Sequence, residues 1–287
     1  MKTVLLPSTV WATAQQPARV QRRDRYLADS TAHPGKMLPT IAQNAIATYS
    51  APGELVLDPM CGIGTTLVEA THLDRQALGV ELEPRWAELA TANLAHANKQ
   101  GAPGHGTVTT GDARRLGDGL LNRHQGQVQL ILSSPPYGSS LHGQVETQPD
   151  RIEKWDNRYS HNPLNLAELP AERHRGGRST FAEALLEILA GCRRMLAPNG
   201  YLVLTARPYR RAGTLVDLPG QLEQLAVEAD LRLQQRLVAL LCAVRDGALV
   251  ARPSFFQMRH QRSGAIPRML LIAHEDVLVF TPRTGRR

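Results

Sequence analysis

The chain has 287 residues and a net charge of +7. Its length and its 42% of hydrophobic residues are ample for a folded core and exclude a disordered chain. The three cysteines are far apart and lack metal-site spacing, so we expect inert thiols in a reducing compartment. The start of the chain lacks the long apolar region of a signal peptide, and no run reaches the ~18 apolar residues of a membrane helix. We therefore predict a cytoplasmic protein with no membrane contact, and the basic balance weakly favours a polyanionic partner.

The first half of the chain is predicted to alternate strands with helices after a basic N-terminal arm. The arm, residues 1–32, is expected to be irregular, and "QQPARVQRRDR" within it carries four arginines and one acid. A proline turn and an apolar stripe predict a helix over 33–50. The elements expected next are a strand at 54–59, a helix at 65–73, a strand at 76–82, a helix at 84–99 and strands at 107–113 and 128–134.

A polar insert at 138–179 interrupts the alternation of strands and helices, and loops of that length are usually functional or disordered. The elements predicted after it are a helix at 181–196, strands at 201–206, 231–242 and 275–280, and a helix at 221–230. The alternation predicts an α/β fold with an open, mostly parallel, doubly wound sheet. We predict one domain over 33–287, whose inserted loop is a candidate for target contact.

Ligands of such sheets bind beyond the carboxyl ends of the strands, where this sequence places three motifs. "LDPMCGIGTT" (57–66) carries Gly62 and Gly64, which allow a tight turn and close approach to a ligand. Leu67 stands where a dinucleotide fingerprint counted from Gly62 needs a third glycine, and there is no phosphate-loop lysine. Diphosphate recognition is therefore disfavoured, although a plain strand–helix turn remains an alternative for this motif alone.

Two acids end the next strands. Glu81 in "GVELEP" can accept hydrogen bonds from both hydroxyls of a ribose, or be a solvated acid before a helix. Asp112 in "GDAR" can accept from an adenine amino group, or cap a turn. A glycine turn, an acid that can bind a ribose and an acceptor for an adenine amino group together predict a nucleoside pocket without a phosphate-binding loop. Such a pocket fits S-adenosylmethionine.

This order of motifs resembles the DNA amino-methyltransferases, which methylate cytosine N4 or adenine N6. "DPMCGIGTT" is similar to their cofactor loop, "SSPPYG" (133–138) to their catalytic turn, "HPGKMLP" (33–39) to the segment before the loop and "HEDVLVF" (274–280) to their closing strand. The resemblance implies a Rossmann-like, seven-stranded sheet with an antiparallel last strand. The cofactor contacts it implies are His33, Lys36, Asp58, Pro59, Cys61, Gly62, Gly64, Thr65, Thr66, Glu81 and Asp112.

The resemblance also assigns catalysis to Ser134, Pro135, Pro136 and Tyr137. An exocyclic amine is a poor nucleophile because its lone pair is delocalised into the ring. The Ser134 hydroxyl and the Pro135 carbonyl can accept its two protons, the prolines hold that carbonyl rigidly, and Tyr137 can stack on a flipped base. This mechanism needs no metal and no nucleophilic cysteine, so a carbon-5 cytosine methyltransferase is disfavoured.

DNA is the predicted partner, and a cognate restriction nuclease is a possible second one. The segment 252–268 has basic residues and no acids, which favours phosphate contacts through Arg252, Arg259, Arg262 and Arg268, although a solvated face is the alternative. Serine at position 134 favours cytosine N4 by family association, with adenine N6 as the alternative. Methylation of an RNA base such as guanine N2 and a non-catalytic nucleic-acid binder remain further readings.

Overall fold

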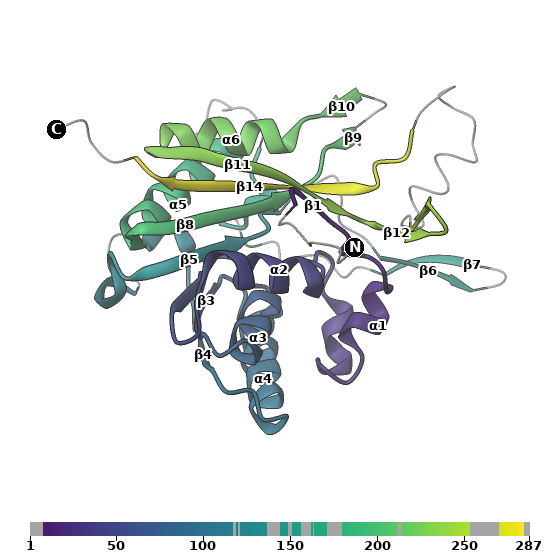
Figure 1. Ribbon diagram of the computed structural model, residues 1–287, viewed down its shortest axis with the longest axis horizontal. Coiled ribbons are helices and arrows are strands. Elements are labelled where there is room, and N and C mark those ends of the chain that lie inside the picture. Colours follow the sequence, from purple (N-terminus) through teal and green to yellow (C-terminus); the bar gives the residue numbers. More distant parts are fainter. Residues whose placement is uncertain are drawn as a thin grey trace, which may run out of the picture.

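The computed structural model describes residues 8–116, 119, 121–136, 144–148, 151–155, 162, 164–170, 180–211, 214–252 and 270–283. Within this part of the chain, eight strands form one sheet in the order β1-β11-β14-β8-β5-β2-β3-β4 (Figure 1). The strands are β1 (Val10–Trp11), β2 (Leu55–Asp58), β3 (Gln76–Glu81), β4 (His105–Thr110), β5 (Val128–Ser133), β8 (Leu196–Ala206), β11 (Leu231–Leu240) and β14 (His274–Pro282).

Strand β14 runs antiparallel to both of its neighbours, while the other pairs of this sheet are parallel. Seven strands therefore have the predicted arrangement, and the predicted fold class is confirmed. The eighth strand, β1, was not predicted. It comes from the arm, where Val10 pairs with Val238 and extends the sheet at the edge formed by β11.

Helices cover both faces of the sheet, as Figure 1 shows. Parallel strands that are buried on both faces alternate their apolar side chains between two cores. Val56 and Leu130 face one core, and Leu57 and Ile131 face the other. The first core is covered by α2 (Pro39–Tyr49), α3 (Thr65–His72) and α4 (Pro84–Lys99), and the second by α5 (Phe181–Met195) and α6 (Leu218–Glu228).

Short elements follow several strands at their carboxyl ends. In the part of the chain that the structure describes, three two-stranded hairpins are β6 (Gln144–Gln148) with β7 (Arg151–Trp155), β9 (Tyr209–Arg211) with β10 (Thr214–Val216), and β12 (Cys242–Arg245) with β13 (Ala248–Ala251). The single-turn helices are η2 (Ala113–Arg115), η3 (Asn122–His124) and η5 (Leu166–Glu168). The hairpins come after β5, β8 and β11, which are parallel to one another, so all three follow the same edge of the sheet.

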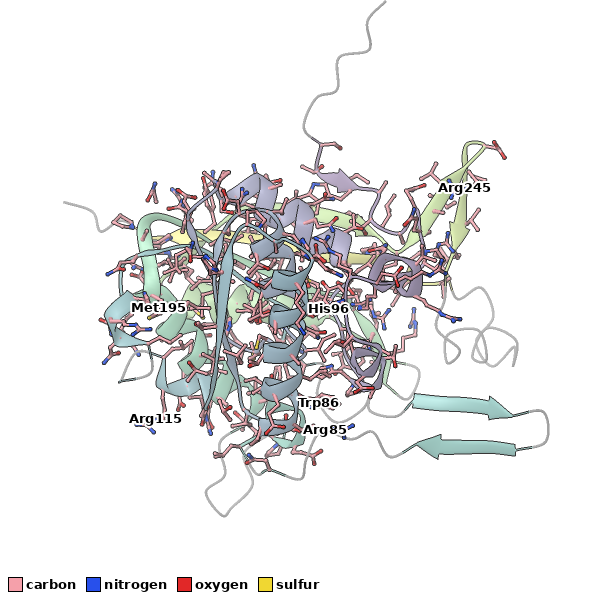
Figure 2. All side chains as sticks on the ribbon, turned by 90° about the horizontal axis from the view of Figure 1, so that it is seen from below. Arg85, Trp86, His96, Arg115, Met195 and Arg245 are labelled. Atoms are coloured by element: carbon pink, nitrogen blue, oxygen red, sulfur yellow. The ribbon has the colours of Figure 1, made fainter. Side chains whose placement is uncertain are left out.

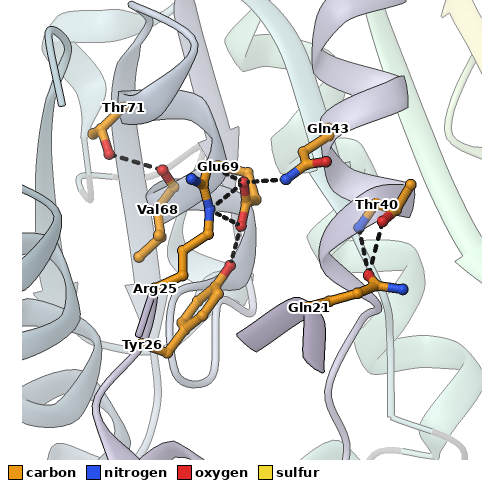
Figure 3. Close-up of polar contacts among 8 residues, drawn as sticks. All are labelled: Gln21, Arg25, Tyr26, Thr40, Gln43, Val68, Glu69 and Thr71. Atoms are coloured by element: carbon orange, nitrogen blue, oxygen red, sulfur yellow. Dashed lines mark hydrogen bonds and ion pairs between the residues drawn. The ribbon is translucent and has the colours of Figure 1, made fainter. Parts of the chain in front are cut away.

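The described part of the arm packs on the domain through α1 (Ala18–Arg22), η1 (Ala28–Ala32) and the residues between them. The contact between the arm and the domain is centred on Glu69 of α3, a fully buried carboxylate. Arg25 forms a two-pronged ion pair with it at 2.5–3.0 Å, and Tyr26 Oη donates at 2.6 Å (Figure 3). Gln43 of α2 donates to it at 2.8 Å. The arm is thus tied to the helix that follows the glycine loop, and its predicted irregularity is only partly correct.

The other boundaries differ by a few residues from those predicted. Helix α2 begins at Pro39 rather than at residue 33, since Leu38 is extended before the first-turn proline. Strand β8 starts at Leu196, directly after α5, and its register against β5 shifts before Leu130 pairs with Tyr201. Leu240 ends β11, and Cys242 already belongs to the next hairpin. None of the described helices is long and apolar enough to cross a membrane.

Candidate active site

The predicted motif residues meet at the carboxyl edge of four adjacent strands. Strands β5, β2, β3 and β4 are parallel neighbours in that order, so their carboxyl ends lie side by side. Asp58 and Glu81 are the last residues of β2 and β3, Asp112 follows β4 and Ser134 follows β5. This is the edge where ligands of open α/β sheets bind.

The loop after β2 requires its glycines. Gly62 and Gly64 have φ of +51° and +80°, in the left-handed region that other residues avoid. A Cβ on Gly62 would lie 3.0 Å from His33 Nε2, and one on Gly64 would lie 3.2 Å from Ala90 Cβ. The Gly64 amide closes the turn by donating to the Cys61 carbonyl at 2.7 Å. The loop therefore lies close to both the segment before α2 and helix α4.

Asp58 holds three segments together. Its Oδ1 accepts from the Met60 amide at 3.1 Å and from the Ser133 hydroxyl at 2.9 Å, while Oδ2 accepts from Thr66 Oγ1 at 2.7 Å. The carboxyl is buried, and burial raises its pKa to about 6 despite these three donors. Asp58 thereby fixes the loop to the start of α3 and to the end of β5.

Glu81 lies beside the glycine loop. Its Oε2 accepts from the Gly62 amide at 2.8 Å, and its Oε1 accepts from the Glu83 amide at 3.0 Å. Burial raises the pKa of Glu81 to about 7, and the nearby carboxylates of Glu83 and Asp58 add to the rise. A carboxylate offers about four acceptor positions, so two donors among the described residues leave capacity for the hydroxyls of a ribose.

Asp112 has a different environment. It caps η2 by accepting from the Arg114 amide at 3.0 Å, and both of its oxygens accept from the Arg114 guanidinium at 2.5–3.0 Å. The predicted cap role is therefore present in the structure. The role of Asp112 as an acceptor from adenine stays a prediction, and it would have to compete with this ion pair.

The segment before α2 places a buried aromatic contact beside the glycine loop. The His33 ring meets Trp86 edge to face with ring centroids 4.7 Å apart, and burial lowers the pKa of His33 to about 3, so the ring is neutral. Figure 2 places Arg85 and Trp86 at the amino-terminal end of α4, where the Arg85 guanidinium lies 4.4 Å from the centre of the Trp86 ring. Lys36 Nζ donates to the carbonyls of Thr31 and His33, and burial lowers its pKa to about 8.

The remaining loop residues are packed rather than exposed. Thr65 and Thr66 are buried at the start of α3, and Pro59 directly follows the end of β2. Cys61 is buried, and its amide donates to the Val80 carbonyl at 2.9 Å. Burial raises the pKa of the Cys61 thiol well above its ordinary value, which leaves no thiolate for nucleophilic attack.

The turn that is predicted to be catalytic begins where β5 ends. Ser134 and Pro136 are half-buried, Pro135 is buried, and Tyr137 lies outside the described residues. Of the predicted nucleic-acid contacts, Arg259, Arg262 and Arg268 also lie outside them. The Arg252 guanidinium donates to the Ala14 carbonyl at 2.9 Å and to the Gln15 carbonyl at 3.1 Å, and its contact with nucleic acid stays a prediction.

Three side chains at this edge make contacts that were not predicted from the sequence. Ser133 bonds to Asp58. Asn165, in the part of the insert just before η5, donates to Glu83 Oε1 at 2.8 Å, so the insert reaches the residue two positions after Glu81. Asn93 of α4 donates to the Ile63 carbonyl of the glycine loop at 2.9 Å and accepts from the Leu27 amide at 3.0 Å. Each contact joins residues at least 30 positions apart, which no local pattern indicates. Among the described residues, no group of three or more His, Cys, Asp or Glu is arranged to hold a metal.

Comparisons with known proteins agree with this geometry. Residues 3–92, which include the glycine loop and Glu81, match the sequence model of a DNA methylase family. The resemblance to the DNA amino-methyltransferases is thereby confirmed, and S-adenosylmethionine is the methyl donor of that family.

The relatives that match part of the chain include tRNA methyltransferases and Type II methyltransferases. A tRNA (guanine(10)-N2)-dimethyltransferase of Methanocaldococcus jannaschii is 32% identical over 134 residues, which cover 44% of this chain and 37% of that protein. The Type II methyltransferase M.SmaI of Serratia marcescens is 32% identical over 94 residues, 29% of this chain and 32% of its own. The chain thus spans about a third of the length of these relatives. The crystal structure of TrmN from Thermus thermophilus has the same fold, with a TM-score of 0.51 and 18% identity over 92% of this chain and 53% of that one.

Proposed function

We propose, from the premise that this chain is a relative of the DNA amino-methyltransferases, that it transfers a methyl group from S-adenosylmethionine to the exocyclic amine of a nucleic-acid base. The observation that carries the proposal is the joining of the two halves of the site. The glycine loop and the catalytic turn occupy adjacent strand ends, and Asp58 connects them through Ser133.

The residues present fit the cofactor. Two glycines with positive φ give the loop a shape that admits close approach to a ligand, and Glu81 has unused acceptor positions beside the Gly62 amide. Glu81 would hold the ribose, and the loop from Asp58 to Thr66 would hold the rest of the molecule with the wall formed by His33. When bound, S-adenosylmethionine supplies an electrophilic methyl group on a sulfonium.

The role of this chain in the chemistry is to prepare the amine. The Ser134 hydroxyl and the Pro135 carbonyl would accept hydrogen bonds from its two protons, which favours a pyramidal nitrogen with an available lone pair. Pro135 and Pro136 restrict the backbone, so this carbonyl is fixed before the base arrives, and such preorganisation contributes strongly to catalysis. Tyr137 would stack on the base once it has left the helix.

DNA cytosine N4 is the favoured target, with adenine N6 as the alternative that uses the same two acceptors. The match to the DNA methylase family and the Type II relatives support DNA. A second candidate is the N2 amine of guanine in RNA, which the similarity to two archaeal tRNA methyltransferases favours. The neutral, buried thiols of Cys61 and Cys192 support an amine rather than a ring carbon as the acceptor.

Nucleoside mass spectrometry tests the proposal. The protein is incubated with methyl-labelled S-adenosylmethionine and either unmethylated DNA or unmodified tRNA, and the digested nucleosides are separated. Label in N4-methylcytosine is the expected result, and label in N6-methyladenine would keep the mechanism but change the base. Label in N2-methylguanosine alone would establish the RNA candidate. Absence of label in both substrates, with cofactor binding shown by calorimetry, would contradict methyl transfer to nucleic acid.

A further inference from the structure

The structure connects β2 and β5 by a side-chain bond at the point where their backbone ladder stops. The last ladder pair joins Leu57 to Ile131. Beyond it, β2 continues into Asp58 and Pro59, and β5 continues through Ser133 into Ser134 and Pro135. Proline has no amide hydrogen and cannot donate to a ladder, so backbone pairing gives these two strand ends little further support.

Beyond the last ladder pair, the Ser133 hydroxyl connects the two strand ends. It is completely buried and donates to Asp58 Oδ1 at 2.9 Å. The other carboxylate oxygen accepts from Thr66, at the start of α3, and this second contact fixes the orientation of the Asp58 carboxylate. One oxygen of Asp58 thus faces the catalytic turn, while the other faces the helix after the cofactor loop.

We propose that Ser133 is a positioning residue, whose bond to Asp58 sets the catalytic turn at a fixed place relative to the cofactor loop. This inference rests on the proposed function and deepens it. Ser133 itself is buried beneath the edge and does not touch the base. It acts through the next residue, Ser134, and through the Pro135 carbonyl, which follow it without an intervening flexible link. A displacement of about 1 Å in such an arrangement costs on the order of 100-fold in rate.

The test compares Ser133→Ala with Ser133→Thr, which keeps the hydroxyl. Thr71→Val is the matched control, because it removes another buried hydroxyl bond, to the Val68 carbonyl at 2.9 Å, on the last turn of α3 (Figure 3). Ser133→Ala is expected to lower kcat at least tenfold and to change the cofactor Kd less than about threefold, with partial recovery in Ser133→Thr. If Ser133→Ala lowers kcat no more than Thr71→Val does, or abolishes cofactor binding, the inference is wrong.

A second measurement, of stability at two pH values, does not depend on catalytic turnover. The Ser133 bond favours the ionised form of Asp58, whose pKa is about 6, so its loss should cost more stability at pH 8 than at pH 5. The other titratable groups that interact with Asp58 are Glu81, Cys61 and Cys192, and they are unchanged in the variant.

The difference in melting temperature between wild type and Ser133→Ala is therefore expected to widen between pH 5 and pH 8. The difference for Thr71→Val is expected to stay constant. A constant difference for Ser133→Ala would overturn the coupling to Asp58. An inactive wild type would contradict the proposed function, and this measurement would still decide whether Ser133 is coupled to Asp58.

Discussion

The substitution Glu81→Gln tests the cofactor pocket at its most informative residue. The amide keeps the shape of the side chain and one acceptor oxygen. Its NH₂ group replaces the other oxygen, and it would then face either the Gly62 amide at 2.8 Å or the Glu83 amide at 3.0 Å, both of which are donors. One hydrogen bond from the ribose is lost and the other loses its charge assistance. Hydrogen bonds to charged groups contribute about 1.5–3 kcal/mol, so we expect a loss of roughly 2–3 kcal/mol.

That loss corresponds to a cofactor Kd raised about 30- to 150-fold at pH 8, measured by isothermal titration calorimetry. Glu88→Gln, on the exposed side of α4, is the matched control and should bind as wild type does. The pKa of Glu81 is about 7, so most wild-type molecules carry a protonated Glu81 at pH 6. The difference in cofactor Kd between wild type and Glu81→Gln should therefore be smaller at pH 6 than at pH 8. Equal affinity of the two proteins at pH 8, with unchanged melting temperature, would remove the ribose role of Glu81.

Three further predictions concern Ser134, Glu69 and the pH dependence that Glu81 gives to stability. Ser134→Ala should lower kcat about 100-fold and leave the cofactor Kd within about threefold, and unchanged turnover in a labelled-methyl assay would exclude Ser134 as an acceptor of the amine protons. Glu69→Ala should lower the free energy of unfolding by about 3–5 kcal/mol in urea titrations, because the Arg25 guanidinium would lose its buried partner. A loss no larger than that of the exposed control Glu88→Ala would contradict this role. The raised pKa of Glu81 means that the native state binds its proton more tightly than the unfolded state between about pH 4.5 and 7. This group should therefore make the protein less stable as pH rises through that window, and Glu81→Gln should flatten the decline of melting temperature.

The strand ends could be predicted from sequence because apolar runs and chain breakers mark them directly. "ELVLDP" contains a short apolar run that stops at Asp58 and Pro59, and the observed strand covers Leu55–Asp58. In a parallel sheet the carboxyl ends share one edge, so knowing where each strand ends already brings Asp58, Glu81 and Ser134 together. Predicting this part of the site required only local sequence signals and one rule of sheet topology.

The contacts that connect these strand ends could not be predicted. Ser133 and Ser134 are adjacent and chemically identical, and only the twofold alternation of a strand sends the first into the interior toward Asp58. The arm was expected to be irregular because it has no apolar period. Its described part is nevertheless held by polar contacts of Tyr26 to Glu69 and of Leu27 to Asn93, which lie 43 and 66 positions away in sequence. Such contacts depend on the complete fold and leave no periodic signal.

Counting the donors to three of the carboxylates separates acids that hold the fold from acids that can hold a ligand. Among the described residues, Glu69 accepts from Arg25, Tyr26 and Gln43 and is saturated, and Asp112 is occupied by the amide and guanidinium of Arg114. Glu81 accepts from two backbone amides, one on each oxygen. A carboxylate has about four acceptor positions, and a buried one gains by filling them. Of these three acids, Glu81 therefore has the most unused acceptor positions for the hydroxyls of a bound nucleoside, whereas Asp112 would first have to release Arg114.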